Sequence, residues 1–445
     1  MPLLRALEQN LIKWKSQSSR KPLLVRGARQ VGKSFLIEAF ATNHFEHVIT
    51  INFELSPEFK DCFQNLDPKP ICTALKVMQD KPIIPGKTLL FLDEIQDCPQ
   101  AIQSLRYFKE NMPQLHVIGA GSLLELVLKN TNFRMPVGRV SSLYLYPLSF
   151  TEFLQAYNPQ ALESIASATL DNPLSEAIHK HLLKQIHLYA LLGGMPEVLS
   201  IYQEDNDIQR VQMIQSEILE TYEKDFGHYE KIAPVSHLKK CFSMIPKMIG
   251  QQIKYHKIDP ELRSVNLKQA LAALEDAAIL QRVHSTSATG LPLDATLNEK
   301  KFKLNFIDVG LVKRANKLDA QLLLQKDMML INQGALTEQF VGQELLAYAE
   351  PYEDAKLYFW ARDKPARAEI DYIFTHGKYI YPIEVKSGVI GKMRSLIQYL
   401  KEHDCPFGIR ISQAPLSLEN RILSIPLYMI SELPRLLEYN DSDFS

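Results

Sequence analysis

The segment from residue 23 to residue 34 joins an apolar run to a loop with two glycines, Gly27 and Gly32, followed by Lys33 and Ser34. Glycine permits backbone angles closed to other residues, so successive N–H groups can point at one anion on the positive end of the next helix. A lysine here reaches the β- and γ-phosphates of a nucleotide, and the next hydroxyl holds Mg²⁺. The alternative is a surface turn that merely contains these residue types. We predict that ATP is bound by the residues of this loop: Gly27, Ala28, Arg29, Gln30, Val31, Gly32, Lys33 and Ser34.

Two adjacent carboxylates, Asp93 and Glu94, end a second apolar run that starts at Thr88. Phosphoryl transfer asks the protein mainly for positioning and charge neutralisation. We therefore predict that Asp93 holds Mg²⁺ through water, that Glu94 polarises the attacking water, and that Lys33 acts on the phosphates. A helix cap would use the same residue types. At this distance after a lysine loop, however, the pair indicates hydrolysis rather than binding alone.

Strands and helices that alternate along the chain must position these residues. Apolar patterning predicts strands over 23–26, 47–54, 88–93 and 115–120, helices between them, and an N-terminal helix over 3–14. Alternation of this kind builds a parallel sheet with ligands at the carboxyl ends of its strands.

Ser122 follows the fourth predicted strand, directly after Gly121. At this edge of the sheet, the Ser122 hydroxyl could bond and so sense the γ-phosphate of a nucleotide held by the loop. A serine here could equally cap the helix predicted over 123–128. Both interpretations stay open at the level of the sequence.

Composition sets outer bounds on the protein. A chain of 445 residues suggests about three domains. The net charge of −1 argues against a polyanion clamp made by the whole protein, although local basic patches remain compatible with it. Five scattered cysteines without CxxC spacing indicate neither a disulfide framework nor a zinc knuckle, which fits a reducing compartment. Because no eighteen apolar residues run uninterrupted, we expect a cytoplasmic protein with no membrane partner.

Several short motifs occur in one order along the chain: GARQVGKS at 27–34, FLDEIQ at 91–96, GAGS at 119–122, GRV at 138–140, PLSFTEFL at 147–154 and GGMPE at 193–197. In this combination the sequence resembles a widespread prokaryotic family of AAA-type ATPases whose C-terminal half is catalogued as a domain of unknown function. The resemblance covers nearly the whole chain. It implies an ATPase core over residues 1–150 and a helical lid over 151–232.

Three further residues take roles from this resemblance. Arg139 corresponds to the arginine of the GRV motif and is a candidate arginine finger or γ-phosphate sensor. The alternative is a structural ion pair with a local carboxylate. Gly194 and Pro196 are similar to the Gly-Gly-x-Pro turn with which lids of related signalling ATPases touch adenine, although a turn that ends a helix explains the same letters. Residues 221–226 also match the family, without an assigned role.

Residues 233–325 look like a winged helix, with helices predicted over 238–253, 259–264 and 266–280 and wing strands over 281–283 and 301–307. Such folds often bind DNA through the third helix. Here that helix carries Lys268 but also Glu275 and Asp276 among many alanines, whereas groove binding needs positive charge. A packing or regulatory module is therefore favoured. Three wing lysines keep DNA as a candidate partner: Lys300, Lys301 and Lys303.

Residues 326–445 resemble the PD-(D/E)XK nuclease core, with a helix from 334, strands over 356–360, 369–375, 379–385 and 407–411, and a helix over 393–403. The resemblance implies that Glu338, Asp371 and Glu384 hold Mg²⁺ while Lys386 aids the attacking water. Glu384 and Lys386 lie two apart on a strand and so face one side. Carboxylate–lysine pairs are nevertheless common on exposed strands, and Glu-Ile-Asp replaces the usual Pro-Asp. The match therefore supports the fold more than the activity.

These predictions combine into an α/β protein: an AAA-type parallel sheet with a helical lid, then a winged helix, then a nuclease-like α/β domain. The favoured function is an Mg²⁺-dependent ATPase that acts as a nucleotide-driven switch for the C-terminal domains. An ATP-gated DNA nuclease is one alternative. A slow signalling or scaffold ATPase that works through a protein partner or self-association is another. ATP and Mg²⁺ are the expected ligands.

Overall fold

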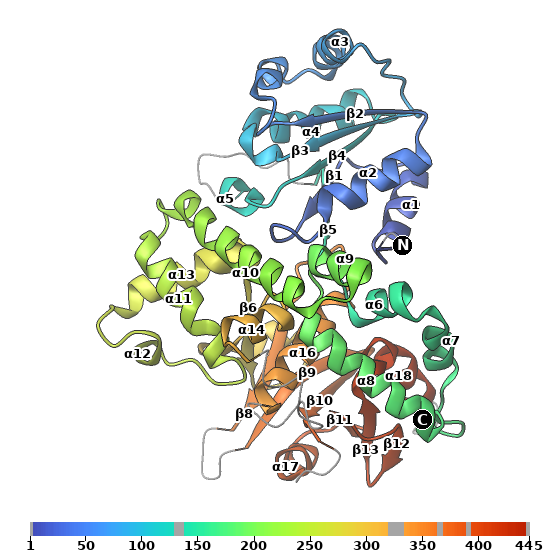
Figure 1. Cartoon of the computed structure of the whole chain (residues 1–445), viewed down its shortest axis with the longest axis vertical. Coiled ribbons are helices and arrows are strands. Elements are labelled where there is room, and N and C mark those ends of the chain that lie inside the picture. The colour runs from blue at the N-terminus through green and yellow to red at the C-terminus, as the bar shows by residue number, and fades with distance from the viewer. Residues whose placement is uncertain (1–2, 129–137, 319–332, 363–367, 389–392, 442–445) are drawn as a thin grey trace.

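The computed structural model describes residues 3–128, 138–318, 333–362, 368–388 and 393–441. Its N-terminal part is a five-stranded, fully parallel sheet in the order β2-β3-β4-β1-β5, at the top of Figure 1. Four of these strands confirm the predicted ones: β1 Leu23–Arg26, β2 His47–Asn52, β3 Thr88–Asp93 and β4 His116–Ala120. The fifth, β5 Ser141–Tyr144, was not predicted; it is a short edge strand that has only one fully buried residue.

Helices cover both faces of this sheet, because the strands alternate their side chains between two cores. Leu23 and Val25 of β1 pack into one core, and Leu24 packs into the other. The N-terminal helix begins at Glu8 rather than at residue 3. The covering helices are α1 Glu8–Ser16, α2 Lys33–His44, α3 Pro68–Gln79, α4 Pro99–Asn111 and α5 Leu124–Leu128, with short 3₁₀ turns at 57–63 and 95–97.

A group of five helices follows this sheet in the chain. In Figure 1 the last two of them lie between the N-terminal sheet and the C-terminal part, whereas the third runs alongside the C-terminal part. The first helix of the group starts in a capping box, in which the Ser149 hydroxyl accepts from the Glu152 N–H and the Glu152 carboxylate accepts from the Ser149 N–H. The helices are α6 Phe150–Tyr157, α7 Pro159–Ser167, α8 Glu176–Leu192, α9 Pro196–Asp205 and α10 Ile208–Asp225. The helical character predicted from residue 151 onwards is confirmed.

The next segment contains three helices, a β-hairpin and a further helix. They are α11 Val235–Met248, α12 Tyr255–Ile258, α13 Ser264–Asp276, β6 Leu280–Thr286, β7 Leu297–Phe306 and α14 Val309–Ala315. The second helix was predicted over 259–264 and is wrong, because Pro260 disfavours a helical conformation at Asp259. The Asp259 carboxylate instead accepts a hydrogen bond from the Glu261 N–H in a turn.

The C-terminal elements form an eight-stranded mixed sheet that includes this hairpin, in the order β12-β13-β11-β10-β9-β8-β6-β7. Strand β6 pairs in parallel with β8, with Val283 opposite Leu357. The sheet is therefore continuous across the boundary expected near residue 325. The remaining elements are α16 Gln333–Ala347, β8 Leu357–Ala361, β9 Glu369–His376, β10 Tyr379–Val385, α17 Arg394–Glu402, β11 Gly408–Ser412, β12 Ser417–Glu419, β13 Ile422–Pro426, a 3₁₀ turn at 427–432 and α18 Leu433–Asp441.

A buried carboxylate on α16 connects the C-terminal part to the helical group. Both oxygens of Glu344 accept from the Phe150 N–H at the start of α6, at 3.1 and 3.0 Å, and the Tyr348 hydroxyl donates at 2.6 Å. Burial raises the pKa of Glu344 to about 8. Across the described residues, none of the helices combines the length and apolarity that crossing a membrane requires.

Replacing Glu344 with glutamine should flatten part of the pH dependence of stability. The folded-state pKa of about 8 lies above the ordinary glutamate value, so the folded protein binds more protons than the unfolded chain between these two pH values. Stability of the wild type should therefore fall as pH rises from about 5 to about 8. Urea unfolding over this range measures the slope, and equal slopes in wild type and Glu344→Gln would contradict the assignment.

Candidate nucleotide-binding site

The predicted phosphate loop lies between β1 and α2 and has the backbone that its glycines permit. Gly27 has a φ of 146° and Gly32 a φ of 90°, both outside the range that other residues readily adopt. A Cβ on Gly27 would lie 2.2 Å from the backbone oxygen of Leu145. The loop therefore needs glycine at this position for conformation and for space, and Lys33 begins the following helix.

Lys33 turns its amine back into the loop. Its Nζ donates to the backbone oxygens of Gly27 at 3.0 Å and Ala28 at 2.7 Å. Burial lowers the pKa of Lys33 to about 8, although the carboxylates of Glu94 and Asp93 oppose that shift. The ammonium is thus buried with incomplete compensation, and phosphate oxygens would supply the missing negative charge.

Ser34 and Asp93 meet at the carboxyl end of β3. The Ser34 hydroxyl donates to Asp93 Oδ2 at 3.0 Å, and Asn52 Nδ2 donates to the same oxygen at 3.2 Å. Burial and the neighbouring Glu94 raise the pKa of Asp93. A hydroxyl and a carboxylate side by side are ligands of the type that Mg²⁺ prefers, so these residues fit the predicted ion. Asn52 was not predicted, since an amide at the end of the neighbouring strand β2 carries no local motif.

Glu94 is held in a conformation that non-glycine residues rarely adopt, with φ 46° and ψ 46°. Its Oε2 accepts from Gln96 Nε2 at 2.7 Å and from the backbone N–H of Ser122 at 3.5 Å. The second contact joins the segments that follow β3 and β4, which are neighbouring strands of the sheet. The structure thus brings Ser122 to the carboxylate predicted to orient water.

The end of α10 contacts the phosphate loop at Arg29. The Tyr222 hydroxyl donates to the backbone oxygen of Arg29 at 2.8 Å, and Asp225 Oδ1 lies 2.6 Å from the Arg29 guanidinium. At the other side of the loop, a Cβ on Gly32 would lie 3.3 Å from Pro196 Cγ, at the start of α9. The motif over 221–226 therefore has a structural role, which the sequence did not reveal: it holds the phosphate loop.

Arg5 forms a third contact with the loop that sequence patterns did not predict. Its guanidinium donates to the backbone oxygen of Val31 at 2.7 Å, to the backbone oxygen of Tyr146 at 2.6 Å and to Glu152 Oε1 at 3.0 Å. Arg5 is buried, so its charge depends on these partners. The N-terminal segment and the α6 capping box are thereby joined to the phosphate loop.

Arg139 and Gly194 have partners other than those their predicted roles require. Arg139 Nε lies 3.0 Å from Glu110 Oε1 on α4, and both side chains are partly exposed. The Gly194 N–H donates to Asp308 Oδ2 at 2.6 Å, and a Cβ on Gly193 would lie 2.0 Å from Asp308 Oδ1. The arginine-finger and adenine roles stay predictions.

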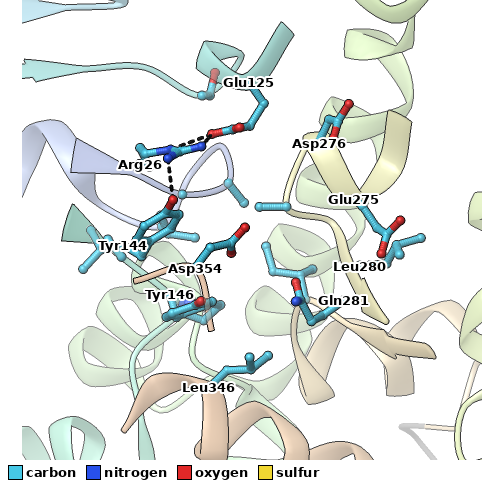
Figure 2. A pocket seen from close by; sticks show the side chains of 18 of the residues that line it. Arg26, Glu125, Tyr144, Tyr146, Glu275, Asp276, Leu280, Gln281, Leu346 and Asp354 are labelled. Carbon is cyan, nitrogen blue, oxygen red and sulfur yellow. Dashed lines mark hydrogen bonds and ion pairs between the residues drawn. The ribbon is translucent and has the colours of Figure 1, made fainter. Parts of the chain in front are cut away.

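A cavity of about 450 Å³ adjoins the start of the phosphate loop, beside Gly27, Ala28 and Ser122. Figure 2 shows Arg26 bonded to Glu125 and Tyr144 at one end of this cavity, with Asp354 in its middle and Gln281 across from it. Its walls come from the N-terminal sheet, from α13 and β6, and from the C-terminal part. The predicted γ-phosphate end of the site thus lies next to an interface between the domains.

The residues of the predicted nuclease-like site meet at one end of β9 and β10, but around a lysine. Lys303 Nζ of β7 lies 2.8 Å from Glu338 Oε1 and 3.6 Å from Asp371 Oδ1. Glu384 Oε1 is 2.5 Å from Lys386 Nζ. Within the ranges that the structure describes, no three histidine, cysteine, aspartate or glutamate side chains are arranged to hold a metal ion. The metal-binding role of Glu338, Asp371 and Glu384 stays a prediction.

Comparison with known families assigns the N-terminal part. Residues 19–154 match the family model described as an AAA domain, and with the phosphate loop and the parallel sheet this makes the region an AAA-type P-loop ATPase domain. Residues 183–322 and 333–430 match two models that are each described as a domain of unknown function, DUF8612 and DUF4143. No curated protein matches the sequence.

Among solved structures, the chain is similar to the Walker-type ATPase PABY2304 of Pyrococcus abyssi, with 15% identity, coverage of 71% of this chain and 96% of the other, and a TM-score of 0.45. It is also similar to the AMPPCP-bound DnaA of Aquifex aeolicus, with 13% identity, coverage of 62% of this chain and 87% of the other, and a TM-score of 0.29. A third similar structure is the Aeropyrum pernix ORC1 protein in complex with DNA, with 13% identity, coverage of 72% of this chain and 95% of the other, and a TM-score of 0.28.

Proposed function

We propose that the protein is an Mg²⁺-dependent ATPase that passes its nucleotide state from the phosphate loop to the helical group and on to the C-terminal sheet. The observation that carries this proposal is the pair of contacts from α10 to Arg29, inside the loop itself. A phosphate that reshapes the loop must strain or break the bonds from Tyr222 and Asp225. The position of α10 would then report whether ATP or ADP is bound.

The chemistry follows from the residues around the loop. Lys33 and the loop N–H groups hold the phosphates, while Ser34 and Asp93 hold the Mg²⁺ ion that neutralises the developing charge. Glu94 orients the attacking water, and Ser122 lies beside it at the γ-phosphate end. Arg139 is proposed as a finger only toward a second copy of the chain, because within its own chain it bonds Glu110.

A route from the site to the C-terminal sheet runs through Asp308. This buried carboxylate accepts from the Gly194 N–H at 2.6 Å and from the Leu311 N–H at 3.0 Å, so it caps α14 while holding the turn before α9. Asp308 lies two residues after the end of β7, and Gln343 Oε1 of α16 accepts from the backbone N–H of Val309 at 2.9 Å. A movement of Pro196 of α9 relative to the phosphate loop would therefore displace α14 and the edge strand β7 of the sheet.

For the remaining regions we propose a winged-helix unit formed by α11–α13 with the β6–β7 hairpin, followed by a nuclease-like core. The order of helices, hairpin and strands supports both proposals. Packing is favoured over DNA binding for the hairpin, because Lys303 is buried and Lys301 is partly buried, which leaves Lys300 as the exposed one of the three wing lysines. The proposed units are 1–150, 151–232, 233–325 and 326–445, the last two sharing one sheet.

The experiment that tests this function measures phosphate release from ATP by the purified chain, with Mg²⁺ and with EDTA. Turnover that depends on Mg²⁺ is expected, and hydrogen exchange along β7 should differ between ATP-analogue and ADP complexes. Linear and circular DNA added to the same reactions should stay intact. Metal-dependent cleavage of that DNA would support the alternative of an ATP-gated nuclease, and unchanged exchange along β7 would contradict the switch.

Changing Tyr222 to phenylalanine should alter ATP turnover without unfolding the protein. The variant loses one hydrogen bond to the Arg29 backbone, worth about 1 kcal/mol or roughly fivefold in an equilibrium. Tyr229→Phe is the matched control, because the Tyr229 hydroxyl is buried nearby without a hydrogen-bond partner in the described structure. Steady-state kinetics should show a shift in KM or kcat for Tyr222→Phe alone. Equal behaviour of both variants would mean that the α10 contact does not sense nucleotide.

A further inference from the structure

Lys303 is a lysine with almost no exposure to solvent, at 1% of its side chain, and it stands among three carboxylates. Its Nζ lies 2.8 Å from Glu338 Oε1, 2.5 Å from Glu369 Oε1 and 3.6 Å from Asp371 Oδ1. Glu338 comes from α16 and the two others from β9, whereas Lys303 comes from β7 at the edge of the sheet. The side chain thus reaches from the edge strand β7 to carboxylates on β9 and α16.

The other oxygens of this cluster are largely committed to protein donors. Glu369 Oε2 accepts from Gln252 Nε2 at 2.7 Å, and Asp371 Oδ2 accepts from the Val385 N–H at 2.8 Å. The exception is Glu384, whose Oε2 is buried without a hydrogen-bond partner in the described structure. Gln252 comes from the segment after α11, and Lys303 comes from β7. Two separate parts of the proposed winged-helix unit therefore contact the carboxylates.

We propose that the Lys303 ammonium is the resident cation of this carboxylate cluster, in place of the divalent metal that a nuclease-like core would hold there. Lysines are almost never fully buried unless they are paired, and here three carboxylates pair with Lys303. A divalent ion bound to the same oxygens would stand close to a charge of equal sign, which is strongly unfavourable at low dielectric. The cluster therefore fastens β7 and the segment after α11 to β9 and α16.

Binding of Mn²⁺ to the full-length chain tests this proposal, measured by calorimetry without nucleotide in an Asp93→Asn background that weakens the ATP-site ion. With Lys303 present we expect no Mn²⁺ binding that depends on Asp371. Lys303→Met should lower the Tm by several degrees and create a Mn²⁺ site that restores the Tm. Adding Asp371→Asn to Lys303→Met should abolish that rescue.

Lys300→Met is the matched control, since Lys300 is an exposed lysine on the same strand. It should keep the parental Tm and gain no Mn²⁺ site. Two results would overturn the proposal: Mn²⁺ binding by the protein with Lys303 intact that Asp371→Asn removes, or a Lys303→Met variant as stable as Lys300→Met. Should Lys303→Met fail to fold, the first of these measurements still decides the matter, because it needs no change at Lys303.

Discussion

Replacing Lys33 with alanine is expected to weaken ATP binding by roughly 10- to 100-fold and to reduce turnover to background, since one bond to a charged group contributes about 1.5–3 kcal/mol. The ammonium is the buried positive charge of the phosphate loop, and it bonds the loop's own carbonyls at Gly27 and Ala28. In the complex the ammonium would donate to phosphate oxygens instead of these carbonyls, and an alanine side chain has no donor for them. Fluorescent ATP-analogue titration and phosphate release measure the two effects.

The lowered pKa of Lys33 should make ATP affinity depend on pH. Its pKa is lowered to about 8 by burial, and bound phosphate would raise it again, so binding takes up a proton above that value. Affinity should therefore fall as pH rises beyond about 8. Lys313→Met is the control, because Lys313 is equally buried on α14 with its pKa also lowered to about 8. ATP affinity that survives in a folded Lys33→Ala protein would refute the proposed site.

Changing Glu94 to glutamine should separate ATP binding from hydrolysis. Glutamine keeps the size of the side chain and its acceptor toward Gln96, but it cannot polarise water as a carboxylate does. A positioned general base contributes about 10²- to 10⁴-fold, so we expect hydrolysis to fall by that order while the Kd for ATP stays close to wild type. Single-turnover phosphate release measures the chemical step directly.

Asp97→Asn provides the comparison for this variant, because it removes an exposed carboxylate three residues further along the same loop. Its hydrolysis rate should equal that of the wild type. A Glu94→Gln protein that hydrolyses ATP normally would reduce Glu94 to a neighbour of the metal ligand. The unusual backbone at Glu94 would then need a purely structural explanation.

The sequence predicted those parts of the protein that short segments determine. The loop between Gly27 and Ser34 can be recognised from the sequence alone, because phosphate binding requires this spacing of glycines and lysine. The parallel strands that end at Asp93 and Ala120 follow from uninterrupted apolar runs, which only a doubly covered sheet can bury. The short edge strand β5 has a single fully buried residue and so carried no comparable signal.

Contacts between distant segments could not be predicted in this way. Tyr222 bonds Arg29 across 193 positions, and Arg5 bonds Glu152 across 147, with no local pattern that names either partner. Lys303 was considered as a wing lysine for DNA because charged residues are usually solvated. Its burial depends on partners on α16 and β9, which lie more than 30 positions further along the chain.

The pairing of β6 with β8 limits how the protein can be divided. A fragment that begins after residue 326 would lack the hairpin, so the apolar strand Leu357–Ala361 would become an open edge of the sheet. Unpaired edges of this kind recruit other chains and aggregate. The same cut would also remove the ammonium of Lys303 from its three carboxylates. Fragments intended to isolate the C-terminal sheet should therefore start before α11, so that the hairpin remains attached.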